Sequence, residues 1–140
     1  MRVDDARGAA LFDQAKCGAC HVPTMKTRAD YPIAPLAGID APVYTDLLLH
    51  DLGSALADGI VEGEATGRDW RTAPLIGLRF NPTLMHDGRV PVMKADVPSA
   101  IDGALLAHAS DGSEANESVS LYQSMSAADR QALLAFVASL

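Results

Sequence analysis

The stretch "AKCGACHVP", residues 15–23, decides the fold. It contains both cysteines of the 140-residue chain, Cys17 and Cys20, and His21 follows at once. Two thiols three positions apart on one turn lie on the same side of the chain, and the next imidazole adds a metal ligand. This pattern is typical of a c-type haem attachment site, in which the thiols bond the two vinyl groups and the histidine binds the iron.

Other sites use the same cysteine spacing. A structural zinc site needs four protein ligands, and His50, His86 and His108 are widely spread, with no second close pair. A redox-active dithiol starts a helix within a strand–helix–strand unit, and no strand-like alternation precedes Cys17. The sequence therefore favours one covalent haem c, with zinc, a redox dithiol and a structural disulfide as the alternatives.

Length and composition indicate one domain, residues 1–140, since a chain of this size with 49% hydrophobic residues can bury a single core. The formal net charge of -7, with no basic cluster, argues against a nucleic-acid partner. No apolar run approaches the roughly 20 residues that span a bilayer. The start "MRVDDARGAA" has no apolar signal core and is expected to be a mature or trimmed terminus.

Helical spacing of apolar residues predicts several helices. The first leads into the attachment turn, with Asp4 or Asp5 as its N-cap, and the last is capped by Ser126. A short helix is expected after Pro42, ended by Gly53, and another follows Ser99 as far as residue 108.

Proline and glycine mark the connections. Residues 22–42 contain four prolines and are expected to form a loop that stays near the haem, while residues 54–70 form a surface loop. Residues 70–90 should be irregular or carry short helical turns. The predicted fold is mainly α: a cytochrome c-like helical domain with long loops around one covalently bound haem.

Further stretches resemble a known family in order and nearly end to end. They are "LFDQAKCGACHVP" (11–23), "YTDLLLHDLGSALADG" (44–59), "EGEATGRDWRTAPLIGL" (62–78), "LMHDGR" (84–89), "ALLAH" (104–108) and "LLAFVASL" (133–140). The chain resembles the carboxy-terminal haem domain of the bacterial di-haem oxidoreductases, labelled thiol oxidoreductases and related to the di-haem cytochrome c peroxidases. It departs from them in having one attachment motif and an apparent insertion, "VPVMKADVPS" (90–99).

The resemblance implies that His108 is the second axial ligand of the iron. Helical spacing agrees, because His108 shares a face with Ile101 and Leu105, and an imidazole on an apolar face needs a partner. The alternative is a histidine hydrogen-bonded to backbone. Met93, within the insertion, is the main rival ligand, followed by Met85 and His86, and an open iron position is the third possibility.

Two further residues are candidates for cofactor binding. Arg71 could pair with a haem propionate or form a surface ion pair. Trp70 could pack at the haem edge or belong to the ordinary core. His50 and His86 are interpreted as structural, anchoring turns. The acidic loop 62–69 is either a solvated face or a docking surface for a basic redox partner.

The expected function is electron transfer by a mono-haem c-type cytochrome domain, with no catalytic residue assigned and a redox protein as partner. One haem favours this over a complete enzyme, because in the resembling family the second centre stores and relays electrons. The alternatives are a peroxidase-like domain of a di-haem enzyme and a haem-based small-molecule sensor. Covalent attachment implies the periplasm.

Overall fold

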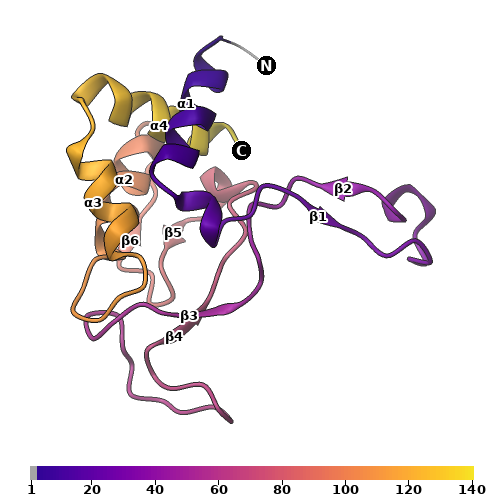
Figure 1. Cartoon of the computed structure of the whole chain (residues 1–140), viewed down its shortest axis with the longest axis horizontal. Coiled ribbons are helices and arrows are strands. Elements are labelled where there is room, and N and C mark those ends of the chain that lie inside the picture. The colour runs from indigo at the N-terminus through magenta and orange to yellow at the C-terminus, as the bar shows by residue number, and fades with distance from the viewer. Residues whose placement is uncertain (1–2) are drawn as a thin grey trace.

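The computed structural model describes the chain from residue 3 to residue 140, and Figure 1 shows its elements. The helices are α1 (Val3–Gln14), α2 (Val97–Ala107), α3 (Asn116–Ser124) and α4 (Ala127–Ser139). Three short 3₁₀ turns are η1 (Cys17–Ala19), η2 (Ala34–Leu36) and η3 (Leu78–Phe80). The strands are β1 (Met25–Lys26), β2 (Asp40–Ala41), β3 (Leu49–Asp51), β4 (Asp69–Arg71), β5 (Thr83–Leu84) and β6 (Val90–Pro91).

The expectation of a mainly α domain is wrong. Strand makes up 12% of the chain against 38% helix, so the architecture is mixed α/β. The strands form three separate antiparallel pairs, β1–β2, β3–β4 and β5–β6. All of them lie in the proline- and glycine-rich middle of the chain, where long helices cannot propagate.

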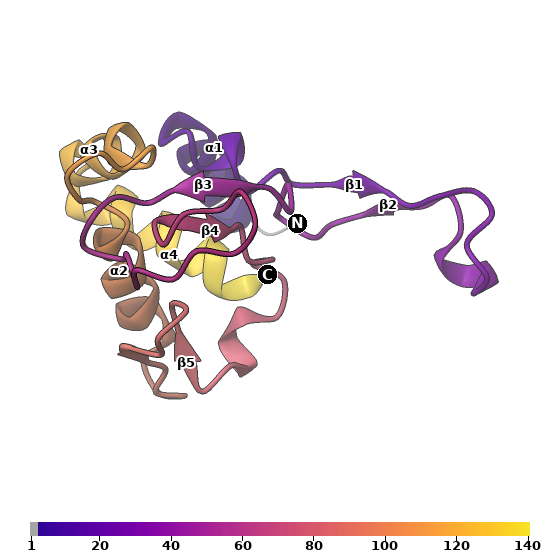
Figure 2. The same cartoon turned by 90° about the horizontal axis from the view of Figure 1, so that it is seen from below.

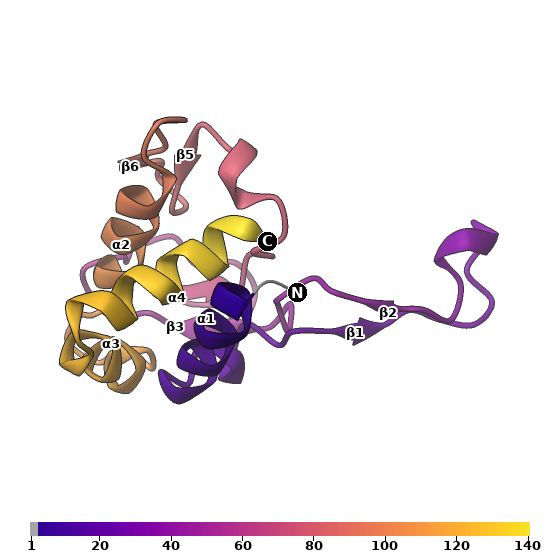
Figure 3. The same ribbon diagram turned by 90° about the horizontal axis from the view of Figure 1, so that it is seen from above.

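The core lies where α1 packs against α4, which cross closely in Figure 3. Phe12 from α1 makes an edge-to-face contact with Phe136 from α4, with the ring centroids 5.8 Å apart. Leu133 is fully buried beside them. These apolar side chains recur at helical spacing, so the first and last predicted helices are confirmed as elements.

Gly8 allows this close helix contact. A Cβ added at Gly8 would overlap the Cβ of Phe136 and lie 2.6 Å from the carbonyl oxygen of Ala132. Neither neighbour is the free end of a flexible side chain, so the two helices would have to separate.

Gly8→Ala is therefore expected to destabilise the protein by about 1–3 kcal/mol, because overpacking outweighs the better helix propensity of alanine. Gly103→Ala in α2 is the matched control, since its nearest neighbour, the Val90 side chain, lies 3.7 Å from the added Cβ. The control should be neutral or slightly stabilising. Chemical denaturation of both variants measures the effect, and equal stability of the two would contradict the packing argument.

The helix expected at residues 43–53 is wrong, because this segment is extended and contains β3. Tyr44 and Leu47 have positive φ angles, of 52° and 61°, which no right-handed helix accommodates. β3 pairs antiparallel with β4, with His50 opposite Trp70. The pairing of β3 with β4 has outweighed the helix preference of the apolar run "LLL".

The helix caps were only partly predicted. Ser126 caps α4 as expected, its Oγ accepting a hydrogen bond from the Asp129 N–H at 3.2 Å. The cap of α2 is Asp96 and not Ser99, whose N–H instead donates to the Asp96 side chain. α1 begins at Val3, so neither Asp4 nor Asp5 is its N-cap. α3 has no counterpart among the predicted helices.

The proline-rich loop is a hairpin that projects from the body. Figures 1 and 2 both show β1, β2 and the segment joining them extending away from the helices. The expectation that this loop stays close to the attachment turn therefore fails for its outer part, although its base at residues 22–23 bonds residues 44–45. None of the helices within residues 3–140 is long and apolar enough to cross a membrane.

Candidate functional site

The attachment turn follows α1 through Lys16, which has a left-handed backbone with φ of 59°. Residues 17–19 form η1, and the N–H of His21 donates to the carbonyl oxygen of Cys17 at 2.9 Å. Cys17 packs against the core beside α1, and neither cysteine is in a disulfide. The two thiols and the imidazole thus share one turn, which a common porphyrin requires.

The surroundings of the thiols keep them neutral. Burial raises the pKa of Cys17 to about 11. Burial also raises the pKa of Cys20, and the negative charges of Asp46 and Glu114 add to the effect. A redox-active dithiol is built to lower the pKa of its thiol. This environment raises the pKa of both thiols, so it argues against that alternative.

His21 is held as a neutral imidazole. Burial lowers its pKa to about 4, against a hydrogen bond to the Tyr44 carbonyl that raises it, and the neighbouring His108 lowers it further. Its Nδ1 lies 3.1 Å from that carbonyl oxygen. Because a carbonyl only accepts, Nδ1 carries the proton and the Nε2 lone pair is left for a metal.

His108 repeats this arrangement at the end of α2. Burial lowers its pKa, against a hydrogen bond between its Nδ1 and the carbonyl oxygen of Ala104 at 2.7 Å. The Nε2 lone pair is again free. The next loop is fixed in turn, since Ser113 Oγ donates to the His108 carbonyl oxygen at 2.6 Å. The fold therefore brings two half-buried histidines close enough for His108 to lower the pKa of His21, although they are 87 positions apart in sequence (108 minus 21).

The rival ligands lie in less favourable positions. Met93 is 69% exposed, and His86 is also exposed. Met85 is half-buried, with a left-handed backbone at φ 69°. Arg71 is exposed and lies opposite Leu49 in the β3–β4 ladder. Side chains alternate between the faces of a strand, so Arg71 and Trp70 point to opposite faces.

The β3–β4 pair turns one face to the attachment turn. His50 and Trp70 are opposite each other in the ladder and so share a face. His50 Nδ1 lies 3.7 Å from Cys20 Sγ. Trp70 stacks on His86, with centroids 3.6 Å apart and planes 15° apart. This face therefore joins Cys20, His50, Trp70 and His86.

His50 is clamped between two carboxylates. Its Nε2 lies 2.9 Å from Asp46 Oδ2 and its Nδ1 2.9 Å from Glu114 Oε2. Burial acts to lower the pKa of His50, but these two partners outweigh it and raise the pKa. Burial likewise disfavours the charge on Asp46, yet hydrogen bonds, first from the Leu48 N–H, lower its pKa to about 2. Hydrogen bonding to His50 lowers the pKa of Glu114.

The same groups form a possible metal cluster, because donor atoms of Cys20, Asp46 and His50 all lie within 4.8 Å of one another. The cluster does not include Cys17. Both nitrogens of His50 are already satisfied by carboxylates. A thioether site uses both cysteines and His21 together, so it accounts for more of the motif than zinc does.

The His50 clamp predicts a pH-dependent stability. Its raised folded-state pKa means that the stabilisation is fully present below its ordinary value of about 6.5 and is lost as the pH rises through the folded pKa. Asp46 and Glu114 have lowered pKa values, so the stabilisation that they contribute is present near neutral pH and is lost in acid as they become protonated. The difference in unfolding free energy between wild type and His50→Gln should be largest near pH 5.5 and about 1 kcal/mol smaller at pH 8.5. Denaturation of the haem-loaded proteins at both pH values measures it, and a pH-independent difference would refute the clamp.

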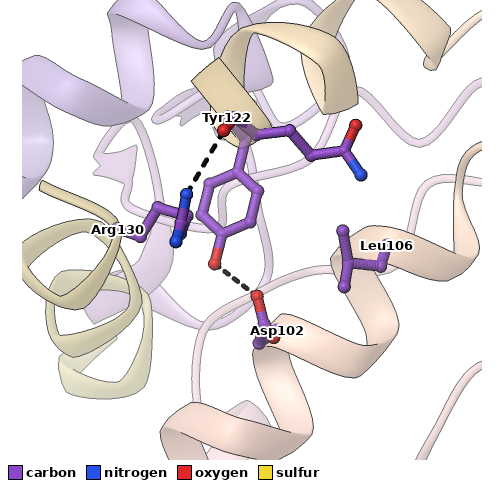
Figure 4. Close-up of a pocket in the computed structure, with 5 residues that line it drawn as sticks. Asp102, Leu106, Tyr122 and Arg130 are labelled. Atoms are coloured by element: carbon purple, nitrogen blue, oxygen red, sulfur yellow. Dashed lines mark hydrogen bonds between the residues drawn. The ribbon is translucent and has the colours of Figure 1, made fainter. Parts of the chain in front are cut away.

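A second polar cluster lies away from the attachment turn, in a depression of about 280 Å³ between α2, α3 and α4 (Figure 4). The Tyr122 hydroxyl donates to the Asp102 carboxylate. Arg130 donates from Nη1 to the backbone carbonyl of Met125 at 2.9 Å. The Tyr122 hydroxyl thus joins α3 to α2, and Arg130 joins α4 to the end of α3. Tyr122 is 1% exposed, so this polar cluster holds the three helices together.

Comparison with protein-family models matches residues 2–140 to a family described as "Di-haem oxidoreductase, putative peroxidase". The chain belongs to the di-haem oxidoreductase family. The resemblance predicted from the sequence is thereby confirmed. Searches of curated proteins and of solved structures gave no match. Membership implies that this di-haem oxidoreductase domain binds haem.

The described residues fit that cofactor on two counts. The thiols of Cys17 and Cys20 share a turn with His21. The Nδ1 of His21 is bound to the Tyr44 carbonyl oxygen, which leaves its Nε2 free for a metal. The buried Nε1 of Trp70 has no hydrogen-bond partner among the described residues.

Sequence reasoning missed several residues that build the site. Tyr44 fixes His21 through its carbonyl, from a left-handed backbone. Asp46 and Glu114 hold His50, which was interpreted only as a turn anchor. A backbone carbonyl leaves no trace in residue type, but the aspartate four residues before His50 was a visible signal.

Proposed function

We propose that this domain is a mono-haem electron-transfer unit of the di-haem oxidoreductase family, with a haem c covalently attached at Cys17 and Cys20. The observation that carries the proposal is the pair of half-buried histidines, His21 and His108, each with its Nδ1 bound to a backbone carbonyl oxygen. Metal-binding histidines are typically fixed in this way, the second ring nitrogen donating to a carbonyl. When bound, haem iron accepts and donates one electron at a time.

Each residue then has a physical task. The carbonyls of Tyr44 and Ala104 fix the rings of His21 and His108, which would hold the iron through their Nε2 atoms. With both histidines bound, no site for a substrate would remain on the iron. His50, beside Cys20, lies between Asp46 and Glu114, so these three groups would act together on the potential of a nearby cofactor.

A peroxidase function is the second candidate, because the family description includes it. It would require an open or displaceable axial position on the iron. If the imidazole of His108 binds the iron, that position is closed. If it does not, the position is open to peroxide. The two functions therefore differ in one property, the coordination number of the iron.

The optical spectrum of the haem-loaded protein distinguishes the two functions. The electron-transfer proposal predicts six-coordinate low-spin iron in both oxidation states, reversible one-electron titration, and no spectral change on adding peroxide or carbon monoxide. A five-coordinate high-spin spectrum that changes with peroxide would instead support the peroxidase, and one that changes only with carbon monoxide would support a sensor.

Location and partner follow as further proposals. Covalent haem attachment takes place outside the bacterial cytoplasmic membrane, so we infer a periplasmic location. A basic redox protein is the partner best suited to a chain with a net charge of -7, because opposite charges steer association. Neutralising Glu62 and Glu64 in the acidic loop would slow that reaction at low salt if the loop is the docking surface.

A further inference from the structure

The loop that follows His108 is docked on the segment that contains β3. The carbonyl oxygen of His108 accepts a hydrogen bond from Ser113 Oγ at 2.6 Å, so the start of this loop is tied to its end. Glu114 then donates its N–H to the Asp51 carbonyl oxygen at 2.9 Å and accepts from the Asp51 N–H through Oε1 at 3.1 Å. The position of the loop 108–114 therefore depends on the position of β3.

Gly53, which is buried just after β3, allows this loop to approach closely. Its φ is 78°, and an added Cβ would overlap Ser110 Oγ and lie 2.7 Å from the carbonyl oxygen of Asp111. Ser110 Oγ also donates to the carbonyl oxygen of Leu52 at 2.9 Å, so the loop is bonded at the point of closest approach. Because the atom of Asp111 belongs to the backbone, a side chain at residue 53 would push the loop outward.

The same segment holds the attachment turn at its other end. The N–H of Thr45 donates to the carbonyl oxygen of Val22 at 3.0 Å. The carbonyl oxygen of Tyr44 lies 3.1 Å from His21 Nδ1 and fixes that ring. Residues 44–53, which we call the brace, thus contact the turn of one histidine at their start and the loop of the other at their end.

We propose that the brace sets the separation of His21 and His108, and that Gly53 is a positioning residue for His108. This rests on the haem ligation of the proposed function and names the segment that keeps its two ligands at the right distance. Metal ligands must lie within about 0.2 Å of their preferred distance. A loop pushed outward at Gly53 would therefore withdraw His108 from the iron, although Gly53 itself has no side chain to touch the haem.

The spin state of the iron tests the proposal in the haem-loaded variants Gly53→Ala and Gly59→Ala. Gly59 has nearly the same left-handed backbone, with φ of 75°, but nothing lies within 4 Å of an added Cβ. The two variants carry the same backbone strain, and only Gly53→Ala presses on the loop. Gly53→Ala should lose part of the low-spin spectrum and gain carbon monoxide binding. Gly59→Ala should keep the wild-type spectrum and bind no carbon monoxide.

Variants of Glu114 cover the case in which Gly53→Ala does not fold. The side chain of Glu114 is 55% exposed, so its replacement leaves the core intact. Glu114→Ala removes the acceptor of the Asp51 N–H and should also admit carbon monoxide, whereas Glu114→Gln keeps that acceptor and should not. Glu64→Ala, in the exposed acidic loop, is the control for the loss of one negative charge and should match the wild type.

A wild-type spectrum in folded Gly53→Ala would overturn this inference alone, as would an equal response in Gly59→Ala. If Gly53→Ala does not fold, a wild-type spectrum in Glu114→Ala would overturn it, and so would an equal response in Glu114→Gln or Glu64→Ala. The proposed function fails on a different result: low-spin iron that survives in His108→Ala, or a chain without covalent haem.

Discussion

His108→Ala is expected to convert the iron from six-coordinate low-spin to five-coordinate high-spin. His108 is half-buried, its Nδ1 donates to the Ala104 carbonyl oxygen, and only Nε2 remains to bind iron. Alanine removes this ligand without adding bulk. The Soret and visible bands of the oxidised and reduced protein measure the change, and the opened position should then bind carbon monoxide.

Methionine variants are the controls for this result. Met93→Ala removes a side chain that is 69% exposed, and Met85→Ala removes a half-buried one. Both should retain the low-spin spectrum. An unchanged spectrum in His108→Ala, or conversion to high spin in a methionine variant, would reassign the ligand and refute the role given to His108.

The largest chemical effect is expected from the cysteines. The double variant, in which Cys17 and Cys20 are both replaced by alanine, should carry no covalent haem, because the chain has no other cysteine. Each single variant should keep the haem through one thioether. Haem staining of the denatured proteins after electrophoresis makes the comparison. Covalent haem in the double variant would contradict the assignment of the motif.

Loss of the haem should also reduce stability. Large apolar side chains in the middle of the chain are exposed, Leu47 at 48%, Leu48 at 61% and Ile76 at 49%. A ligand that binds only the folded state stabilises it by mass action. The double variant should therefore unfold at a lower denaturant concentration than the wild type.

The sequence predicted local arrangements better than the fold of the middle of the chain. Cys17, Cys20 and His21 are adjacent in sequence, so their spacing alone brings them onto one turn. α1 and α4 were also predictable, because their buried side chains follow a helical period that packing against each other satisfies. Local periodicity is reliable where the partner face is large and regular.

The middle of the chain was not predictable in the same way. "LLLHDLG" follows a proline and has apolar residues, which favours a helix, but the left-handed Leu47 and the pairing of His50 with Trp70 make it extended. Local sequence predicts neither the left-handed backbone of Leu47 nor the pairing of β3 with β4. α3 was missed because its sequence, "NESVSLYQS", has few apolar residues and its buried side chains are only Val119 and Tyr122.

The surroundings of the two histidines required the three-dimensional structure. Helical spacing placed His108 on the face of Ile101, but its electrostatic effect on His21 depends on tertiary structure. The hydrogen bond from His21 to the Tyr44 carbonyl oxygen depends on backbone geometry. Such features can be recognised only after the chain has folded.

The intact mass of the denatured protein, expressed with a haem attachment system, tests the central claim most directly. The account predicts a chain heavier by one haem, with the added mass on the peptide containing Cys17 and Cys20 after digestion. A mass equal to that of the unmodified chain, with both cysteines free, joined to each other or bound to zinc, would contradict it.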